Sequence, residues 1–347
     1  MIQKSGLGHY IVNLAASLKK INSTLSIDLI CPKSKEDLST PKRIIWDQWT
    51  FPKKAKKRKP DIIHKPCFSA PIFKKGPTVV TVHDLIPIIF PKNVSFFSRF
   101  FYNRIMPFSF RFVDAIITIS TSSKNDLIKY LRISPKKITV IPLAAAENYK
   151  PITDQDKIEK IKKKYGIQKN YILSVSTIEP RKNIPFLIEA FGKVLKNNPR
   201  LDYQLVLTGK KGWGLETIEK TIAKNKLEDK VVFTGYVDDE DMATIYSGAT
   251  LFAFPSTYEG FGLTPLEAMA CGIPVICSNA SSLPEVCGDA AIMLDPNDSV
   301  AWSKNIAELL SDKNVLQKMS TKSLTQSKKF SWAKTAEETL SVYKSIL

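Results

Sequence analysis

Two carboxylates, Glu259 and Glu267, lie eight positions apart where a predicted strand gives way to a predicted helix. Gly260 and Gly262 separate them, and glycine allows a backbone to approach a ligand closely. Thr264 fits the N-cap of the helix, so that Glu267, three residues later, fits a capping box. Capping would account for Glu267 but not for Glu259.

A pair of acids in this position suits a ligand rich in hydroxyl groups. A carboxylate repels phosphate but accepts two hydrogen bonds from vicinal hydroxyls. Backbone amides near Gly262 and Leu263 could bind a phosphate at the helix N-terminus, with the two acids holding sugars on either side. The layout fits a ribose and a hexose joined through a diphosphate.

A pair of cations follows another predicted strand, at 170–177. Arg181 and Lys182 lie in the turn before a helix whose predicted N-cap is Asn183. A helix N-terminus attracts phosphate, and two cations beside it make a diphosphate a suitable ligand. A solvated turn with incidental charge is the alternative interpretation.

The composition is that of a basic globular chain. Of 347 residues, 44% are hydrophobic and 24% charged, and the formal net charge is +18. Such a charge implies an anionic partner, which could be nucleic acid, a membrane leaflet or a phosphorylated substrate. Residues 53–59 are basic at six of seven positions. A solvated loop is the simplest interpretation, ahead of a membrane patch and of nucleic acid, for which no recognition motif is found.

Other patterns bear on the cellular location. No apolar run approaches ~20 residues, and the N-terminus lacks the features of a signal peptide. Five scattered cysteines favour reduced thiols in the cytoplasm. Residues 95–113 interleave aromatic residues with arginines, which suits a membrane interface, a core-facing helix or both.

Strand patterns alternate with helical patterns along the chain. Strands are predicted at 77–87, 114–120, 137–143, 170–177, 203–209, 230–236, 249–256 and 274–279, with helices at 122–131, 183–198, 238–249 and 330–347. Two consecutive βα series predict two doubly wound parallel sheets, separated within the polar segment 144–166. Ligands bind beyond the carboxyl ends of such strands, hence in a cleft between the domains.

These motifs together resemble a known family. Residues 231–296 are similar to the donor domain of retaining glycosyltransferases of family 4, which have the GT-B fold. The resemblance extends to EPRKN at 179, VTVHDLIP at 80 and SGLGHY at 5, and so covers nearly the whole chain in order. Within the family, the sequence most resembles bacterial mannosyltransferase-like members that build surface polysaccharides.

The resemblance implies an α/β protein of GT-B fold, with two Rossmann-like, doubly wound domains facing a central cleft. It places an N-terminal acceptor-side domain at 1–147 and a nucleotide-sugar donor domain at 148–328. The C-terminal helix, at 329–347, would cross back to the N-terminal domain.

The resemblance also implies a role for each donor-domain residue. Glu267 would bind the ribose hydroxyls of the nucleotide, and Glu259 would hold hydroxyls of the donor sugar. Arg181 and Lys182 would neutralise the departing diphosphate. Many relatives carry a Gly-Arg pair that supplies a second phosphate cation where this strand ends at 174–177 with Ser-Val-Ser-Thr, and Arg181 would compensate for it here.

Three residues of the N-terminal domain are implicated in the same way. His83 would face the donor sugar; a buried histidine with a local partner is the alternative. Gly6 and Gly8 would bring the first loop close to donor phosphate and acceptor. Relatives have a complete strand before this loop, whereas residues 1–4 are too short for one. We therefore expect a start site placed too late or a trimmed chain, with an upstream reading frame that encodes an apolar strand.

We therefore expect a retaining glycosyltransferase that transfers a hexose, mannose as the first choice, from a nucleoside-diphosphate sugar such as GDP-mannose. The acceptor would be a saccharide or a lipid-linked saccharide, and the departing phosphate would help to deprotonate it. No cofactor or metal is expected, because the acidic run 238–241 suits a helix start.

The expected location is the cytoplasm, with the anionic inner face of the cell membrane as a candidate partner, and no nucleic acid. Two other interpretations stay open. One is a basic nucleic-acid-binding protein on a Rossmann-like scaffold. The other is a sugar-nucleotide-binding protein without catalytic activity.

Overall fold

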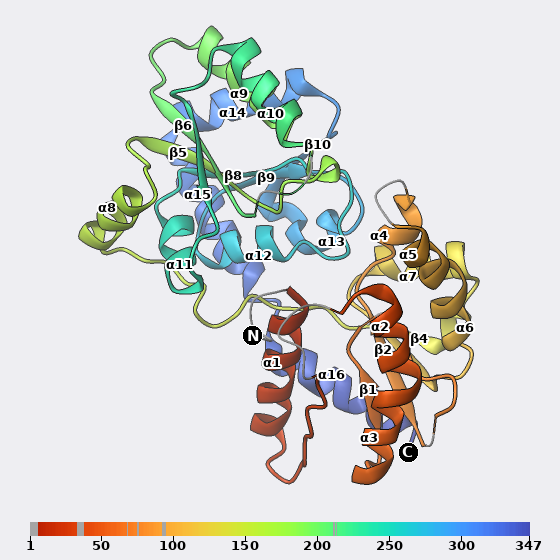
Figure 1. The fold of residues 1–347 in the computed structure, drawn as a ribbon. Coiled ribbons are helices and arrows are strands. Elements are labelled where there is room, and N and C mark those ends of the chain that lie inside the picture. Colours follow the sequence, from red (N-terminus) through yellow and green to blue (C-terminus); the bar gives the residue numbers. More distant parts are fainter. Residues whose placement is uncertain are drawn as a thin grey trace. The chain divides into compact units, whose positions relative to one another are not determined.

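The computed structural model describes residues 6–32, 38–67, 69–74, 76–91, 95–210, 212 and 214–347. The chain divides into two compact units, each described here by itself (Figure 1). Unit 1 comprises Met1–Leu143 and Ser331–Leu347, and unit 2 comprises Ala144–Phe330. These boundaries differ by a few residues from those expected at 147/148 and 328/329.

Unit 1 contains a parallel sheet. Its described strands are β1 (Ile63–Lys65), β2 (Thr78–Val82), β3 (Ala115–Thr118) and β4 (Ile138–Val140), in that spatial order. Every residue of β2 and β3 is buried, as in a parallel sheet covered on both faces. The β-branched runs of the sequence predicted β2, β3 and β4. The short β1 was not predicted.

The helices of unit 1 fall into three groups. Before β1 lie α1 (Gly6–Ile21), α2 (Thr40–Ile45), η2 (Trp46–Thr50) and α3 (Phe51–Arg58); after β2 lie α4 (Ile86–Ile89), α5 (Phe96–Phe100), η4 (Phe101–Ile105) and α6 (Met106–Ser109); and later in the chain lie α7 (Thr121–Leu131), η5 (Pro135–Lys137) and α16 (Trp332–Ser345). Two runs are continuous, α2–η2–α3 and α5–η4–α6, each with a five-residue π-helical segment in its middle.

The first glycines differ from expectation. Helix α1 begins at Gly6, so Gly6 and Gly8 lie in its first turn and do not form a loop. A Cβ added at Gly6 would meet no atom within 4 Å, so space alone does not require glycine there. The segment expected to be too short for a strand, residues 1–4, lies outside the described residues.

Unit 2 contains a doubly wound parallel sheet. Its described strands are β5 (Asn170–Val175), β6 (Tyr203–Thr208), β7 (Val231–Gly235), β8 (Leu251–Phe254), β9 (Val275–Ser278) and β10 (Ala291–Leu294), in the spatial order β10-β9-β8-β5-β6-β7. The chain therefore builds outward from β5 in one direction and from β8 in the other. All of these strands except β10 were predicted from the sequence.

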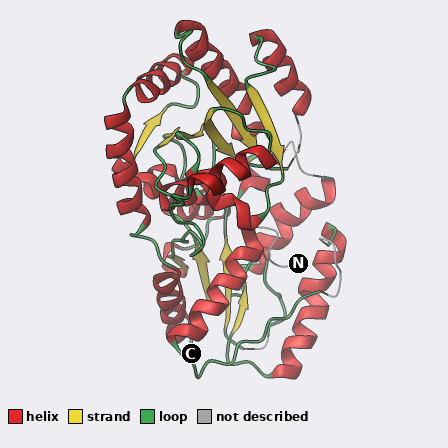
Figure 2. Ribbon diagram, turned by 90° about the vertical axis from the view of Figure 1, so that its left-hand side faces the viewer, coloured by secondary structure: helices red, strands yellow, loops and turns green. Residues whose placement is uncertain are grey.

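Helices cover both faces of this sheet (Figure 2). They are α8 (Gln155–Lys164), η6 (Pro180–Lys182), α9 (Ile184–Asn197), α10 (Leu215–Asn225), α11 (Asp239–Ser247), α12 (Leu263–Ala270), α13 (Leu283–Cys287), η7 (Gly288–Ala290), α14 (Ser299–Ser311) and α15 (Lys313–Ser327). Successive strand residues point to opposite faces. Ile172 packs in the core with Leu187 of α9, and Leu173 in the core with Ile245 of α11.

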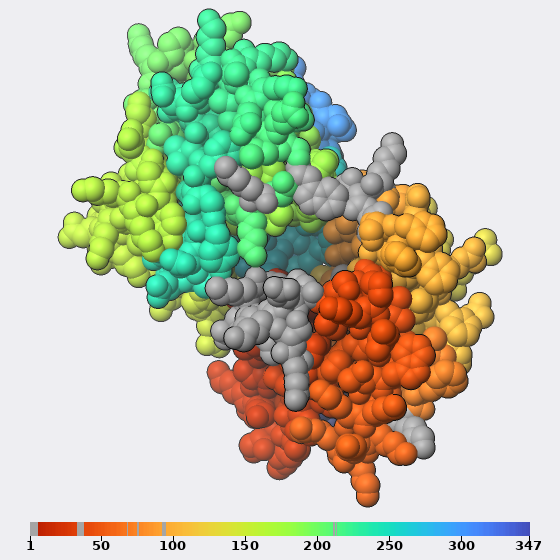
Figure 3. Space-filling model, in the orientation of Figure 1, coloured from red at the N-terminus to blue at the C-terminus, as the bar shows by residue number. Residues whose placement is uncertain are grey.

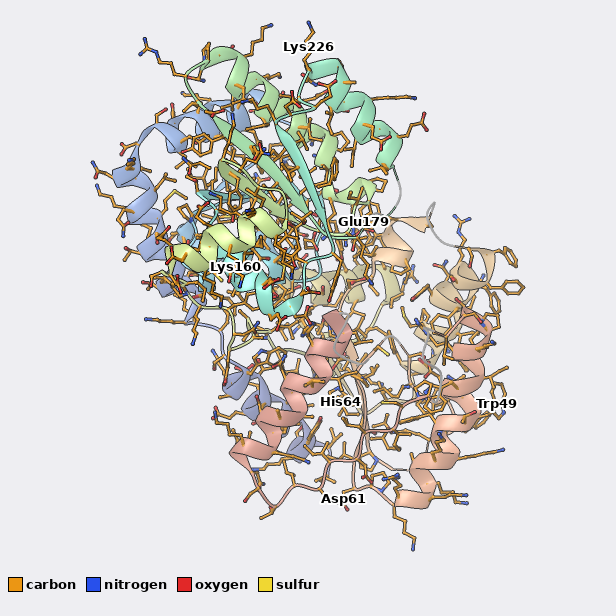
Figure 4. The ribbon with its side chains drawn as sticks, turned by 60° about the vertical axis from the view of Figure 1, so that its left-hand side comes forward. Trp49, Asp61, His64, Lys160, Glu179 and Lys226 are labelled. Carbon is orange, nitrogen blue, oxygen red and sulfur yellow. The ribbon has the colours of Figure 1, made fainter. Side chains whose placement is uncertain are left out.

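The C-terminal helix α16 belongs to unit 1, where it packs against α1. A chain of partly buried hydrogen bonds ties it to the sheet. The Tyr343 hydroxyl lies 2.6 Å from His64 Nδ1, and His64 Nε2 lies 2.7 Å from Thr81 Oγ1, which is 2.9 Å from the Tyr10 hydroxyl. Figure 4 labels His64. Burial lowers the pKa of His64 to about 3, so its ring is neutral.

We predict that Tyr343→Phe destabilises unit 1 by about 1–3 kcal/mol, because it leaves a buried histidine nitrogen without its partner. The free energy of unfolding from urea titrations measures this loss. Tyr130→Phe is the control, because Tyr130 is 42% exposed and lies on α7. Equal stability of the two variants would contradict a stabilising role for the chain of hydrogen bonds.

Candidate functional site

The sheet order of unit 2 brings two loops together. β5 and β8 are neighbours, with Ile172 opposite Leu251, although about eighty residues separate them in sequence. Because the two strands are parallel, the segments that follow them, 176–182 and 255–262, leave the same edge of the sheet. The backbone amide of Thr257 donates to the carbonyl of Arg181 at 2.8 Å, which joins the loops directly.

Glu259 is the centre of the site. Its side chain accepts from Lys182 Nζ at 2.5 Å and from Ser256 Oγ at 2.6 Å, and Arg181 Nη1 lies 3.0 Å from the same oxygen. Its backbone amide donates to Ser281 Oγ at 2.7 Å. Only 9% of Glu259 and 9% of Lys182 is exposed. The carboxylate is therefore held by three side-chain partners in a nearly water-free position.

Arg181 is fixed by more than Glu259. Its Nη1 also donates to the carbonyl of Tyr258 at 2.8 Å, and its Nη2 lies 2.6 Å from Oε1 of Glu179, labelled in Figure 4. The ammonium of Lys182 lies 5.0 Å from the ring centre of Phe254, within the range of a cation–π contact. Both cations are thus oriented before any ligand binds.

The opposite charges of this cluster stabilise one another's ionised forms. Burial would raise the pKa of Glu259, but Lys182 and Arg181 lower it overall, so the carboxylate is ionised. Burial lowers the pKa of Lys182, and the attraction of Glu259 opposes that shift. The ion pair thus offsets part of the cost that burial imposes on each charge.

Helix α12 begins differently from the predicted capping box. Gly262 is the N-cap residue, with φ +113°, and Leu263 is the first helical residue. A Cβ at position 262 would also lie 2.9 Å from Leu283 Cδ2, so both the backbone angle and the space require glycine. Thr264 therefore lies inside the helix, and the expectation that it caps the helix is wrong.

Glu267 is held by tyrosines. Its Oε2 accepts a hydrogen bond from the Tyr246 hydroxyl at 3.1 Å. Burial raises the pKa of Glu267 to about 8, although hydrogen bonds from Tyr246 and Tyr149 act in the opposite direction. The rings of the two tyrosines lie edge to face at 5.8 Å. Neither tyrosine was identified from the sequence, because they lie in segments of helical or polar pattern without a motif.

Asn183 occupies the N-cap position of α9, as predicted, but does not cap it. Its backbone is left-handed, with φ +55°, and its side chain makes no capping bond. Instead its Nδ2 donates to the carbonyl of Pro296 at 2.8 Å. The residue thus anchors the loop after β10 beside the turn that carries Lys182.

His83 lies in unit 1, after β2. Its Nε2 is 3.0 Å from the carbonyl of Pro66, and its ring meets Tyr10 edge to face at 4.8 Å. Because a carbonyl only accepts, Nε2 carries the proton and donates. Burial lowers the pKa of His83 to about 4, so the ring is neutral near pH 7. The local partner of the alternative interpretation is present, and the role toward a donor sugar stays a prediction.

The predicted site residues therefore fall into two groups, one in unit 2 and one in unit 1. The structure brings Arg181, Lys182 and Glu259 into contact, and the loop that carries Glu259 continues into the helix start with Gly262, Leu263 and Glu267. Gly6, Gly8 and His83 belong to unit 1. Ser256, Ser281, Tyr149 and Tyr246 are the partners that sequence reasoning missed.

The acidic run at the start of α11 has local partners. Asp241 accepts from Lys164 Nζ at 2.6 Å and from the Tyr165 hydroxyl at 2.9 Å. Within the described ranges, no group of three or more His, Cys, Asp and Glu side chains is placed to hold a metal ion.

Comparison with known proteins agrees with this architecture. Residues 5–145 match the family model Glycosyltransferase Family 4, and residues 157–326 match Glycosyl transferases group 1. The O-antigen chain mannosyltransferase B of Escherichia coli is 34% identical over 82% of this chain and 74% of its own length. The serotype-specific mannosyltransferase WbdA of Escherichia coli is 36% identical over 75% of this chain, which spans about a third of WbdA.

Solved structures support the fold. Sucrose-phosphate synthase from Thermosynechococcus elongatus superposes with a TM-score of 0.77, at 20% identity, over 98% of this chain and 93% of that one. Anabaena HepE, solved in complex with UDP-glucose, gives 0.67 at 21% identity over 78% and 72% of the two chains. Two Rossmann-like units with this site define a glycosyltransferase of GT-B fold, as the sequence predicted. The chain belongs to glycosyltransferase family 4 and is an enzyme of the hexosyltransferase class.

The buried ion pair generates a stability prediction. We expect Lys182→Met to lower the free energy of unfolding of unit 2 by about 3 kcal/mol, because it removes the nearest counter-charge of buried Glu259. The double variant Lys182→Met/Glu259→Gln should regain most of this loss, since neither charge remains. Chemical denaturation measures all variants.

The matched control is Lys220→Met, which breaks an ion pair of 2.6 Å with Glu216 whose side chains are 75% and 81% exposed. That substitution should cost at most about 0.5 kcal/mol. A Lys182→Met variant no less stable than this control would show that the pair does not hold the two loops together.

Proposed function

We propose that the chain is a retaining glycosyltransferase that transfers a hexose, mannose as the first choice, from a nucleoside-diphosphate sugar. The observation that carries the proposal is the cluster in which Arg181 and Lys182 converge on Glu259, one loop away from Glu267. Two cations, a pair of acids and a helix N-terminus are what a sugar-diphosphate-nucleoside ligand requires.

Each group has a defined task in this proposal. Lys182 and Arg181 bind the diphosphate, and the first amides of α12, at Leu263, add donors to it. Glu259, ionised by its cationic partners, accepts from hydroxyls of the hexose. Glu267 accepts from the ribose hydroxyls.

The reaction follows from the distribution of charge. Breaking the bond between the anomeric carbon and the diphosphate oxygen moves an electron pair onto the diphosphate and leaves positive character on the sugar. Fixed cations at the phosphate stabilise that transition state. The acceptor hydroxyl attacks the face that the leaving group departs from, and its proton passes to the departing phosphate. In this scheme Lys182 and Arg181 take the role that a divalent cation would otherwise have, and no dedicated protein base is needed.

The acceptor is proposed from the relatives. One is named an O-antigen chain mannosyltransferase and another a serotype-specific mannosyltransferase, and both are over 30% identical to this chain. We infer that this enzyme takes part in the synthesis of a surface polysaccharide and that its acceptor is a saccharide or a lipid-linked saccharide. It would act in the cytoplasm, at the inner face of the cell membrane. No helix in the described ranges is both long and apolar enough to cross a bilayer.

Thermal stabilisation by nucleotides tests the donor. A ligand that binds only the folded protein raises its melting temperature, so we expect one nucleoside diphosphate and its sugar, with guanine as the first choice, to stand out from a panel. Glu267→Gln and the double variant Lys182→Met/Glu259→Gln should lose that shift. Glu216→Gln, at an exposed position of α10, is the matched control and should keep it.

The other outcomes identify other functions. A nucleotide shift without transfer or hydrolysis of the sugar would identify a sugar-nucleotide-binding protein without activity. Salt-sensitive binding of DNA or RNA, with no nucleotide-sugar shift, would favour a nucleic-acid-binding protein. No shift with any nucleotide would contradict the proposed donor site.

The raised pKa of Glu267 predicts a pH dependence of donor binding. Below about pH 8 this carboxyl is protonated in the free protein, and hydroxyl donors bind the carboxylate better. Binding then releases a proton, so affinity should rise by up to about tenfold per pH unit as pH increases toward 8, and level off above it.

Calorimetric titration with a nucleoside-diphosphate sugar measures this dependence without interference from a terminal phosphate, because its diphosphate is esterified at both ends. Glu267→Gln should bind weakly and independently of pH. A wild-type affinity that is flat between about pH 6 and 8 would show that Glu267 does not contact the donor as a carboxylate.

A further inference from the structure

Exposed aromatic side chains gather on one part of unit 1. Among the described residues, the phenylalanines and tryptophans that are exposed all lie in unit 1: Trp49, Phe73, Phe96, Phe97, Phe100, Phe108 and Phe112. All except Phe73 belong to the two continuous helical runs or to the residues that follow them directly. Phe96 is 80% exposed and Trp49 56%. An exposed apolar concentration of this kind marks an interaction site.

The two runs form one surface. The hydroxyls of Thr40 on α2 and Ser98 on α5 lie 2.7 Å apart. Ile44 of α2 packs on the same buried cluster as Tyr102 and Ile105 of η4. We call the surface of residues 40–58 and 96–112 the aromatic–basic surface. Figure 3 shows its two segments in neighbouring shades of orange, and Figure 4 labels Trp49.

The exposed charged residues of this surface are all basic. Residues 40–58 and 96–112 contain ten lysines and arginines and a single acid, Asp47. Asp47 is only 4% exposed, because it accepts from Lys65 Nζ at 2.7 Å and from Ser69 Oγ at 2.6 Å. Of the basic residues, Arg58 has an acidic partner from outside the surface, Asp28, at 2.8 Å.

Basic side chains lie against aromatic rings in both segments of the surface. Lys54 Nζ lies 4.8 Å from the ring centre of Trp46, and the Arg111 guanidinium lies 5.6 Å from that of Phe108. Phe108 and Phe112 are in edge-to-face contact, with ring centres 5.2 Å apart. Aromatic rings beside long basic side chains are typical of groups that sit between water and acyl chains.

We propose that the aromatic–basic surface binds an anionic lipid bilayer, with its phenylalanines and Trp49 among the acyl chains and its lysines and arginines at the lipid phosphates. A bilayer supplies both an apolar layer and a sheet of negative charge above it, which is what this surface complements. The core of a protein interface, in contrast, is depleted of charged residues, especially lysine.

Vesicle co-sedimentation tests the proposal on the full chain. We expect binding to vesicles of phosphatidylglycerol and phosphatidylcholine, little binding to pure phosphatidylcholine, and loss of binding as salt increases. Lys53→Gln/Lys56→Gln/Lys57→Gln should weaken the partitioning about a hundredfold, since each basic residue near an anionic surface contributes about fivefold. Phe96→Ser/Phe100→Ser should weaken it at least tenfold, even at low salt.

Matched variants on unit 2 test whether vesicle binding depends on the aromatic–basic surface in particular or on the charge and hydrophobicity of the protein in general. Lys313→Gln/Lys318→Gln/Lys322→Gln removes the same charge from exposed positions of α15, and Val300→Ser/Val315→Ser removes exposed apolar side chains. Both controls should bind vesicles as the wild type does. All of these variants should keep the nucleotide-dependent thermal shift, because none of the substituted residues belongs to the proposed donor site.

Several results would overturn the proposal. One is absence of vesicle binding, and another is an equal loss of binding in the surface variants and in the matched controls. A third is dimerisation in solution that the phenylalanine substitutions abolish, which would assign the surface to a second copy of the chain. Binding of RNA that depends on the same lysines, without lipid binding, would assign it to nucleic acid. The donor site is tested separately, so vesicle binding and nucleotide binding can fail independently.

Discussion

The buried carboxylate of Glu259 is the constraint on which the site depends. An ionised acid with 9% of its surface exposed is stable only beside counter-charges, and the chain supplies Lys182 and Arg181 from a loop nearly eighty residues earlier. That meeting is possible because β5 and β8 are adjacent in a parallel sheet whose strand order reverses between them. The fold thus positions the charges, and the ion pair in turn fixes the two loops.

The two acids of the site differ in their electrostatic state. Glu259 is ionised, because two cations outweigh its burial. The partners of the Glu267 side chain among the described residues are the hydroxyls of Tyr246 and Tyr149, and burial raises its pKa to about 8. Environments that separate the pKa values of paired carboxylates commonly give them separate tasks. Here an acid with a lowered pKa lies among the cations, and an acid whose pKa is raised to about 8 lies at the helix start.

Much of the fold could be predicted from the sequence, because it follows from local pattern. The β-branched runs of buried parallel strands identified β5 and β8, whereas β1 has only three residues, too few for a clear pattern. The GT-B architecture and the family followed from the motifs around Lys182 and Glu267, and both were confirmed. The proximity of Arg181, Lys182 and Glu259 in the structure depends on strand order, which no local pattern encodes.

The two helix-capping predictions that the structure does not confirm, at Thr264 and Asn183, were wrong for the same reason. Thr264 and Glu267 have the spacing of a capping box, but the preceding Gly262 takes the N-cap position, because only glycine fits its φ of +113° beside Leu283. Glu267 is then free to accept from Tyr246, twenty-one residues earlier. Asn183 likewise stands at a helix start but donates to Pro296 instead of capping. In each case a tertiary contact replaces the local bond that the sequence favours.

The net charge of +18 is a further case in which the sequence alone does not show which residues the fold brings together. The sequence showed a basic run at 53–59 and an aromatic, arginine-containing run at 95–113, and each alone was compatible with ordinary packing. In the structure α2 meets α5, Asp47 turns inward to Lys65, and the remaining charges and rings share one surface. The partner of a basic protein is therefore defined less by its net charge than by which apolar groups the fold places among the cations, and here those groups lie in unit 1, in a different unit from the donor site.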